Sequence, residues 1–253
     1  MNWIKELSIT NKDIILKKLE KIVGQDFVSN KPVDLFIYSQ DSGASLPRPV
    51  DFVVMPKNVK EVQKVVFLAN EEKIPLVPMG AGMTLSGLTI PIKGGIVVDM
   101  KRMDQILEIN EISRYVIIEA GVTTGRLTAY LEKNHPELQV SIPDAPPSAT
   151  IMGNALIHGS GFLSQKYGNH GDMINGLEVI LPTGEICKLG SCCVSDSCTC
   201  QLCAWGSNHS RIHIPVSLRI PNAIRSKRHR CGRNPVGGPC PSCPIPVLVP
   251  IAF

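Results

Sequence analysis

Two glycine-rich segments contain the residues whose types and spacing could do chemistry. The first, PLVPMGAGMTLSGLTIP, covers residues 75–91, with glycines at positions 80, 82 and 87 and hydroxyl side chains at Thr84 and Ser86. Glycine permits positive φ, and successive main-chain N–H groups free of bulky side chains can converge on phosphate oxygens. The segment therefore predicts a phosphate-binding loop, although a plain glycine-rich turn has the same composition.

Two familiar phosphate loops fit this segment poorly. A dinucleotide fingerprint that begins at Gly80 and Gly82 needs its third glycine where Leu85 stands. A P-loop needs a lysine beside its last glycine, and the sequence has no lysine between Lys73 and Lys93. If the loop binds phosphate, it belongs to another class.

The second segment, residues 141–185, reads SIPDAPPSATIMGNALIHGSGFLSQKYGNHGDMINGLEVILPTGE. Small residues at 148–150 would let a flat ligand lie against the main chain, while Thr150 or Asn154 bonds its edge. A tight loop packed on a sheet would show the same pattern. His158 and His170 also lie here, and each is expected to be packed or solvated rather than catalytic.

Alternating helices and strands must position these segments. Apolar spacing predicts a helix over residues 11–24, and Asn58 with Glu61 forms a capping-box start for a helix over 58–73. Strands are predicted on either side of that second helix, at 51–56 and 74–80, so these two strands should be parallel. Further predicted elements are strands at 94–100, 114–121 and 138–143, a helix at 123–135, and a hairpin at 176–189 that turns at Pro182-Thr183-Gly184.

The composition changes abruptly near Gly190. Residues 1–190 carry 19 basic and 21 acidic side chains, a net charge of −2, whereas residues 191–253 carry 7 basic side chains and only Asp196, a net charge of +6. Eight of the nine cysteines and eight prolines also lie in this tail. We expect the tail to be disordered, and translation in a shifted frame is one hypothesis for its composition.

A zinc module in the tail is the alternative. The pairs Cys200–Cys203 and Cys240–Cys243 have CxxC spacing, and His209 and His213 follow the first pair. The gap of 36 residues between the pairs and the cysteines left over argue against such a module, so no metal is expected. The basic cluster at 225–233 has no interleaved aromatic residues, so no nucleic-acid partner is expected.

Targeting signals are equally weak. The first residues have no basic stretch followed by an apolar run, and no apolar run approaches the ~20 residues of a membrane helix. The default expectation is a cytoplasmic protein with no membrane span.

The two glycine-rich segments together carry a family resemblance. PMGAGMTLSG, PDAPPSATIMGNALIHGSG and KYGNHGDMINGLEVILPTGE, with YSQDSG and PVDFVVMPKNVKEVQKVV upstream, stand in the order found in FAD-binding domains of the PCMH, or vanillyl-alcohol-oxidase, type. The sequence most resembles the flavin subunit of glycolate oxidase and FAD-linked D-lactate dehydrogenases. The resemblance implies an α+β fold of two α+β subdomains over residues 30–190, after a helical segment at 1–29 and before the disordered tail at 191–253.

The resemblance also implies which residues bind the cofactor. The loop at 79–84 with Ser86 and Gly87 would hold the FAD pyrophosphate, the residues from Pro143 to Gly161 would line the ribityl chain and flavin ring, and Val179 would contact the adenine. The full set is Met79, Gly80, Ala81, Gly82, Met83, Thr84, Ser86, Gly87, Pro143, Asp144, Ala149, Thr150, Gly153, Asn154, Gly159, Gly161 and Val179. Met83 displaces the threonine that follows the second loop glycine in many members, and with no histidine between Gly80 and Pro91 the FAD is expected to be non-covalent.

Three functions stay open at this point. The resemblance implies a flavin-dependent oxidoreductase that takes a hydride from a small 2-hydroxy acid, such as glycolate or D-lactate, and that has an iron–sulfur partner subunit. Relatives carry a substrate domain of which residues 191–253 show no pattern, so we expect a truncated chain, and we assign no catalytic residue. The alternatives are a flavin-binding protein without turnover and a zinc-binding module built on the tail.

Overall fold

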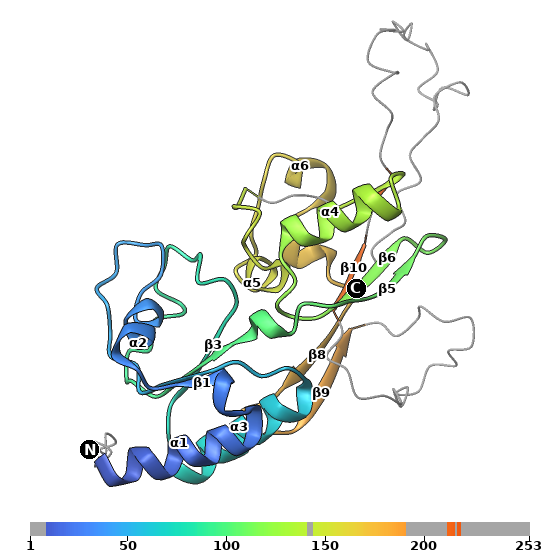
Figure 1. Cartoon of the computed structure of the whole chain (residues 1–253). Coiled ribbons are helices and arrows are strands. Elements are labelled where there is room, and N and C mark those ends of the chain that lie inside the picture. The colour runs from blue at the N-terminus through green and yellow to red at the C-terminus, as the bar shows by residue number, and fades with distance from the viewer. Residues whose placement is uncertain (1–8, 141–143, 191–211, 216, 219–253) are drawn as a thin grey trace, which may run out of the picture.

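The computed structural model describes residues 9–140, 144–190, 212–215 and 217–218, and these form two α+β subdomains (Figure 1). The first has a four-stranded sheet in the order β1-β2-β4-β3, and the second a five-stranded sheet in the order β5-β6-β10-β8-β9. The two expected subdomains are therefore confirmed. Residues 1–8, Pro143 and most of the tail predicted to be disordered lie outside the described residues.

The elements of the first subdomain begin and end as follows: α1 Ile9–Val23, η1 Gln25–Phe27, β1 Val28–Ser29, α2 Pro32–Tyr38, β2 Phe52–Val54, α3 Val59–Glu72, β3 Leu76–Met79, β4 Ile96–Asp99 and η2 Met100–Arg102. Helix α1 and strand β1, which the sequence assigned to a segment before the domain, pack into this subdomain. The predicted helix start at Asn58 is confirmed, because its side chain accepts a hydrogen bond of 3.0 Å from the N–H of Glu61.

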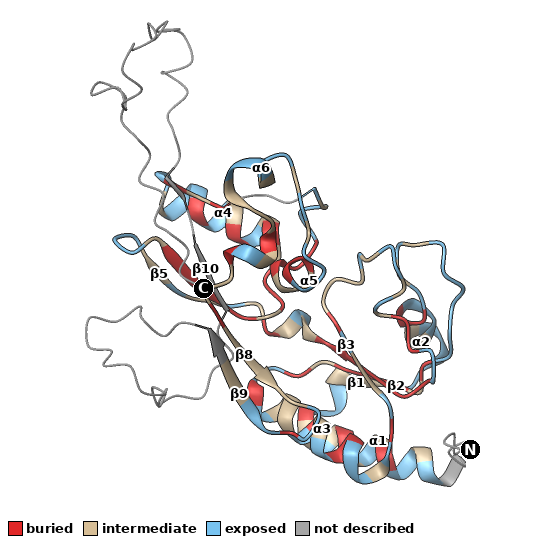
Figure 2. Cartoon of the chain, turned by 180° about the vertical axis from the view of Figure 1, so that it is seen from behind, coloured by how far each residue is buried: buried red, intermediate tan, exposed pale blue. Residues whose placement is uncertain are grey.

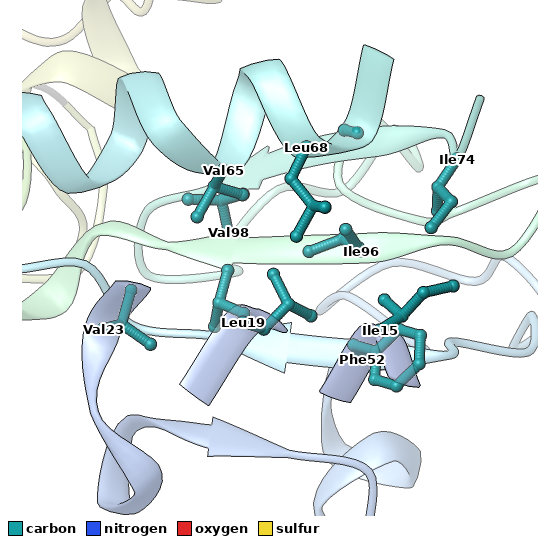
Figure 3. Close-up of a cluster of buried hydrophobic side chains, with 11 residues drawn as sticks. Ile15, Leu19, Val23, Phe52, Val65, Leu68, Ile74, Ile96 and Val98 are labelled. Carbon is teal, nitrogen blue, oxygen red and sulfur yellow. The ribbon is translucent and has the colours of Figure 1, made fainter. Parts of the chain in front are cut away.

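Alternation along the central strands explains the layers of this subdomain. Phe52 and Ile96 turn one way into a core shared with α1 and α3, which Figure 3 shows. Val53 and Val97 turn the other way, toward a second cluster that includes Tyr38 of α2. Successive strand side chains point to opposite faces, so the sheet needs a cover on both, and α2, which the sequence analysis missed, covers the second face.

The predicted β–α–β unit is present, with one addition. Strands β2 and β3 are parallel as expected, but β4 lies between them and pairs in parallel with each. All four residues of β4 are buried, as befits a central strand, whereas β3 is mostly half-buried at the edge. The pairing places β4 in the middle of the sheet, and its burial on both faces agrees with that position.

The elements of the second subdomain are β5 Ile106–Asn110, β6 Tyr115–Ile118, α4 Thr124–Asn134, β7 Leu138–Gln139, α5 Ile151–Leu156, α6 Ser164–Tyr167, η3 His170–Met173, β8 Gly176–Ile180, β9 Ile186–Gly190, β10 Ile212–Pro215 and β11 Ser217–Leu218. Its core joins α4 to the sheet through Val116, Ile118, Leu127 and Leu131, all almost fully buried. Figure 2 shows buried segments on α4 and on the strands next to it.

Two segments of the tail differ from the expectation of disorder. Strand β10 pairs antiparallel with both β6 and β8, and β11 pairs with β7. The apolar residues Ile212 and Ile214 alternate with His213, a strand pattern that the overall composition of the tail concealed. The expectation of disorder is therefore wrong for these six residues.

The β8–β9 hairpin ties the two subdomains together. Its strands belong to the second sheet, while its turn reaches α3 of the first subdomain (Figure 1). There the side-chain amide of Gln63 donates a hydrogen bond of 2.8 Å to the carbonyl of Gly184, and that of Asn70 donates one of 2.5 Å to Pro182. The predicted turn is confirmed, and it has a docking role that its sequence did not indicate.

Gly95 offers a test of the packing at the start of β4. It has φ +100°, and a Cβ atom there would overlap the carbonyl oxygen of Pro75, whereas Gly24 has φ +95° and its nearest neighbour would be 3.4 Å away on Phe27. Gly24→Ala should cost about 1–2 kcal/mol of unfolding free energy through backbone strain alone. Gly95→Ala should cost more than about 3 kcal/mol, because β4 must also move. Urea unfolding measures both; equal losses would contradict this packing.

Candidate functional site

The first glycine segment forms the loop that leaves β3. Met79, the last residue of β3, is buried and stands opposite Asp99 at the end of the neighbouring parallel strand β4. The loop therefore begins at the carboxyl ends of parallel strands, where open α/β sheets place their ligand crevices.

The main-chain donors divide this loop into two halves. Among the described residues, the N–H groups of Ala81, Gly82 and Met83 donate no hydrogen bond, and Gly82 has φ +69°. In the second half, Ser86 N–H donates to Thr84 Oγ1 at 3.3 Å and Gly87 N–H donates to a carboxylate oxygen of Asp41 at 2.8 Å. The N–H groups of Thr84 and Leu85 likewise donate no hydrogen bond among the described residues, so the run from Ala81 to Leu85 offers free donors to an anion whereas Ser86 and Gly87 do not.

The side-chain hydroxyl of Thr84 is also hydrogen-bonded. Its hydroxyl donates a hydrogen bond of 3.0 Å to Asp41. Sequence analysis predicts Thr84, Ser86 and Gly87 as phosphate contacts; here the Thr84 hydroxyl and the Gly87 N–H donate to Asp41, and the Ser86 N–H donates to Thr84.

The second glycine segment contains helix α5, which the sequence pattern does not predict. Thr150 begins this helix, and its hydroxyl accepts a hydrogen bond from the N–H of Gly153 at 3.3 Å. Ala149 accepts one of 3.0 Å from the N–H of Thr124, at the start of α4. The first bond caps α5, and the second joins its start to the start of α4.

Asn154 is the unusual residue of α5. It is only 6% exposed, and its Nδ2 atom has no hydrogen-bond partner among the described residues. A buried amide donor without a partner carries a desolvation cost of about 1–3 kcal/mol. Such an atom marks a position where a ligand acceptor would fit.

The two segments meet at Gly80. A Cβ atom on Gly80 would overlap the hydroxyl oxygen of Thr150, and a Cβ atom on Gly159 would overlap the side chain of Asn154. The free donors of residues 81–83 therefore lie beside the first turn of α5, at the junction of the two subdomains. We call this set of groups, the loop at 80–83 with Thr150, Asn154 and Gly159, the cradle.

The other predicted site residues lie at varying distances from the cradle. Asp144, which precedes α5, donates its N–H to the carbonyl of Ser160 at 2.9 Å, and Gly161 donates its N–H to the Ser164 hydroxyl at 2.8 Å, so both bond to the loop that follows α5. Val179 lies in β8 and pairs with Cys187 across the hairpin. Pro143 lies outside the described residues.

Neither histidine of the second segment is placed for an evident role in the cradle. His170 is buried, and its main-chain N–H donates a hydrogen bond of 2.9 Å to the carbonyl of Gly159. The side chain of His158 is 57% exposed, with Nε2 3.5 Å from a carboxylate oxygen of Asp172.

One group of side chains in the described part of the chain has ligand atoms close enough to hold a metal ion. Glu111, His135 and Glu137 lie on the surface of the second subdomain, with these atoms within 4.8 Å of one another. The ion pair of 2.5 Å between His135 Nδ1 and Glu111 accounts for their approach. The side chains of the tail residues considered for zinc lie outside the described residues.

Sequence analysis missed two carboxylates next to the loop, Asp41 and Asp99. Asp99 is fully buried and accepts hydrogen bonds from the Tyr38 hydroxyl at 2.5 Å and the Lys101 N–H at 2.9 Å. Burial of Tyr38, followed by its bond to Asp99, raises the pKa of this phenol, which therefore stays a donor. The sequence did carry a signal for Asp99, because this acidic residue ends the otherwise apolar strand IVVD.

Comparison with known proteins identifies the family. Residues 50–190, more than half of the chain, match the family described as FAD binding domain. The chain belongs to this family. Its PCMH type is evident from p-cresol methylhydroxylase, whose crystal structure with bound substrate superposes with a TM-score of 0.73 at 25% identity, over 86% of this chain and 45% of that chain.

Curated relatives of this FAD-binding domain include two hydroxy-acid enzymes. Glycolate oxidase subunit GlcD of Bacillus subtilis (strain 168) is 31% identical over 179 residues, which is 70% of this chain and 37% of the relative. The mitochondrial cytochrome-dependent D-lactate dehydrogenase of Arabidopsis thaliana is 32% identical over 188 residues, 74% of this chain and 31% of the relative. The chain thus spans about a third of the length of these relatives. In the part of the chain that the structure describes, no helix has the length and apolar character to cross a membrane.

The unpaired Asn154 amide predicts an unusual effect on stability. Asn154→Leu removes the buried donor and should leave the unfolding free energy of the ligand-free protein unchanged or raise it by about 1 kcal/mol. Thr150→Val, four residues away, removes the helix cap and should lower it by about 1 kcal/mol. Thermal and urea unfolding of both variants, in protein stripped of ligand, test the contrast. A larger loss for Asn154→Leu than for Thr150→Val would mean that the amide is satisfied in the free protein.

Proposed function

We propose that this chain is the FAD-binding part of an oxidoreductase that oxidises a small 2-hydroxy acid of the glycolate or D-lactate class. The observation that carries the proposal is the cradle, where unpaired N–H groups of residues 81–83 and the unpaired amide of Asn154 lie at one junction. The family is one of FAD-binding domains, and relatives named for glycolate, D-lactate and D-2-hydroxyglutarate support the substrate class.

The groups of the cradle fit the chemistry of FAD. Free main-chain N–H groups at the carboxyl ends of parallel strands suit the pyrophosphate, which needs donors and close approach of the backbone. Asn154 would bond a polar edge of the flavin or its ribityl chain, and Gly159 keeps the space beside Asn154 free of a side chain. Val179 would contact the adenine end.

The chain's own residues would bind and orient the cofactor and exclude water from it. Bound FAD supplies the hydride-accepting centre at its N5 atom, and the protein supplies position and electrostatics. Thr150 and Asn154, held in place by the helix cap of α5 and by burial, would bind and orient the cofactor. We assign the role of catalytic base to no residue.

We propose that the FAD is held without a covalent bond, because the loop from Gly80 to Pro91 has no histidine or cysteine to form one. We also propose a separate subunit as electron acceptor, of the iron–sulfur type that the resemblance implies. Support comes from relatives that are themselves named as subunits, glycolate oxidase subunit GlcD and the 4-cresol dehydrogenase flavoprotein subunit of Pseudomonas putida.

Purified protein tests the cofactor assignment directly. The full chain should bind FAD, turn yellow, and release all of the flavin into the supernatant on acid precipitation. Gly80→Ala should weaken FAD binding at least about tenfold, because its Cβ would overlap Thr150 and displace the loop by enough to lose a hydrogen bond to the charged pyrophosphate. Gly24→Ala, remote from the cradle, serves as the control. Protein that stays colourless after incubation with FAD would overturn the proposal, and flavin retained in the pellet would show covalent attachment.

Anaerobic reduction tests the substrate class. Glycolate or D-lactate should bleach the bound flavin near 450 nm faster than 4-cresol does. 4-Cresol is the necessary comparison because a 4-cresol dehydrogenase subunit is also a relative, at 29% identity over 198 residues. Bleaching by 4-cresol alone would refute the hydroxy-acid assignment, and bound flavin that no substrate reduces would favour flavin binding without turnover.

A further inference from the structure

Asp41 is bonded directly to the glycine loop. It lies between α2 and β2, and one carboxylate oxygen accepts hydrogen bonds from Gly87 N–H at 2.8 Å and from the Thr84 hydroxyl at 3.0 Å. The other oxygen accepts the N–H of Gly43 at 2.8 Å. One side chain thus joins two segments that are more than 40 residues apart in the sequence.

Main-chain contacts strengthen the same junction. The N–H of Ser42 donates a hydrogen bond of 3.1 Å to the carbonyl of Thr84, and a Cβ atom on Gly43 would overlap the carbonyl of Leu85. The hydroxyl of Ser42 also lies 3.7 Å from the sulfur of Met83. The segment around Asp41 therefore holds the second half of the loop closely, from Thr84 to Gly87.

The carboxylate is in its charged form near neutral pH. Burial by itself would raise the pKa of Asp41, but the hydrogen bonds from Gly43, Gly87 and Thr84 outweigh burial and lower it. A carboxylate and a phosphate accept hydrogen bonds from the same kinds of donor. Asp41 thus stands in the loop as an anion that belongs to the protein.

We propose that Asp41 is a positioning residue for the cofactor: its carboxylate occupies the donors at Thr84 and Gly87, orders that half of the loop, and directs the FAD pyrophosphate to residues 81–83. This inference rests on the proposed binding of FAD in the cradle. It explains why the N–H of Gly87 and the hydroxyl of Thr84 are withheld from an anion while the N–H groups of residues 81–83 are free. It also explains the displaced threonine, since Thr84 bonds Asp41 instead of phosphate.

Replacing Asp41 changes both the order of the loop and its charge, and the two effects oppose each other. Loss of a negative charge near the cradle would favour an anionic ligand, but charges near a protein surface interact weakly through water. Asparagine has one oxygen where the carboxylate has two, and its NH₂ group would face an N–H donor. Loss of the charge-assisted hydrogen bonds should therefore dominate.

The test compares Asp41→Asn with Asp104→Asn in the full chain. Asp104 carries the same charge in a surface ion pair with Arg126 at 2.5 Å, so it controls for charge alone. Asp41→Asn should raise the dissociation constant for FAD about tenfold or more, whereas Asp104→Asn should leave it unchanged. Riboflavin has no pyrophosphate, so its binding should be the same in all three proteins. Thr84→Val should weaken FAD binding to a smaller extent, and Thr84→Ser, which keeps the hydroxyl, should restore it.

Amide hydrogen exchange gives a second readout that needs no cofactor. The N–H groups of Gly43 and Gly87 should exchange slowly in the wild-type protein and at least about tenfold faster in Asp41→Asn. FAD affinity in Asp41→Asn equal to wild type would overturn the inference and leave the proposed function standing. An equal loss of FAD and riboflavin binding would also overturn it, because the effect would then be general unfolding. A wild-type protein that binds no FAD would instead refute both proposals.

Discussion

The close approach of Gly80 to Thr150 is the contact on which the site depends. It brings a loop of the first subdomain against the first turn of α5 in the second, with no room for a side chain between them. Because the backbone itself forms the junction, the loop with the unpaired N–H groups of residues 81–83 starts against the first turn of the helix that carries the buried amide of Asn154. Neither subdomain offers both sets of groups, so the cradle exists only where the two meet.

Two buried cores hold this junction in place. In the first, the sheet is covered on both faces, by α1 with α3 and by α2, and in the second α4 packs on the five-stranded sheet (Figure 2). The β8–β9 turn, bonded to Gln63 and Asn70 of α3, ties the subdomains at a second place. A loop bound between fixed bodies has little freedom to rearrange, which suits a group that must be held in one orientation.

Sequence patterns predicted the elements better than their partners. Period 3.6 and the capping box at Asn58 located α1 and α3, and β-branched runs located β2, β4 and β6, because these signals depend on neighbouring residues. Helix α2, helix α5 and strand β10 were missed. Helix α2 buries only Tyr38 and has no apolar stripe of its own, and α5 is only six residues long. Strand β10 pairs with strands that are far away in the sequence. Local sequence patterns likewise did not predict that β4 lies between β2 and β3.

For the site, the sequence by itself determined which segments carry the glycines, the small residues and Thr150 and Asn154, and their order identified the type of FAD-binding domain. These features are local and follow from residue type and spacing. Only the tertiary structure decided which loop N–H groups stay free and which are taken by Asp41, because hydrogen bonds between residues 41 and 87 follow from how the chain folds back on itself. For the same reason it alone showed that the two glycine segments meet, since one-dimensional spacing does not encode a contact between Gly80 and Thr150.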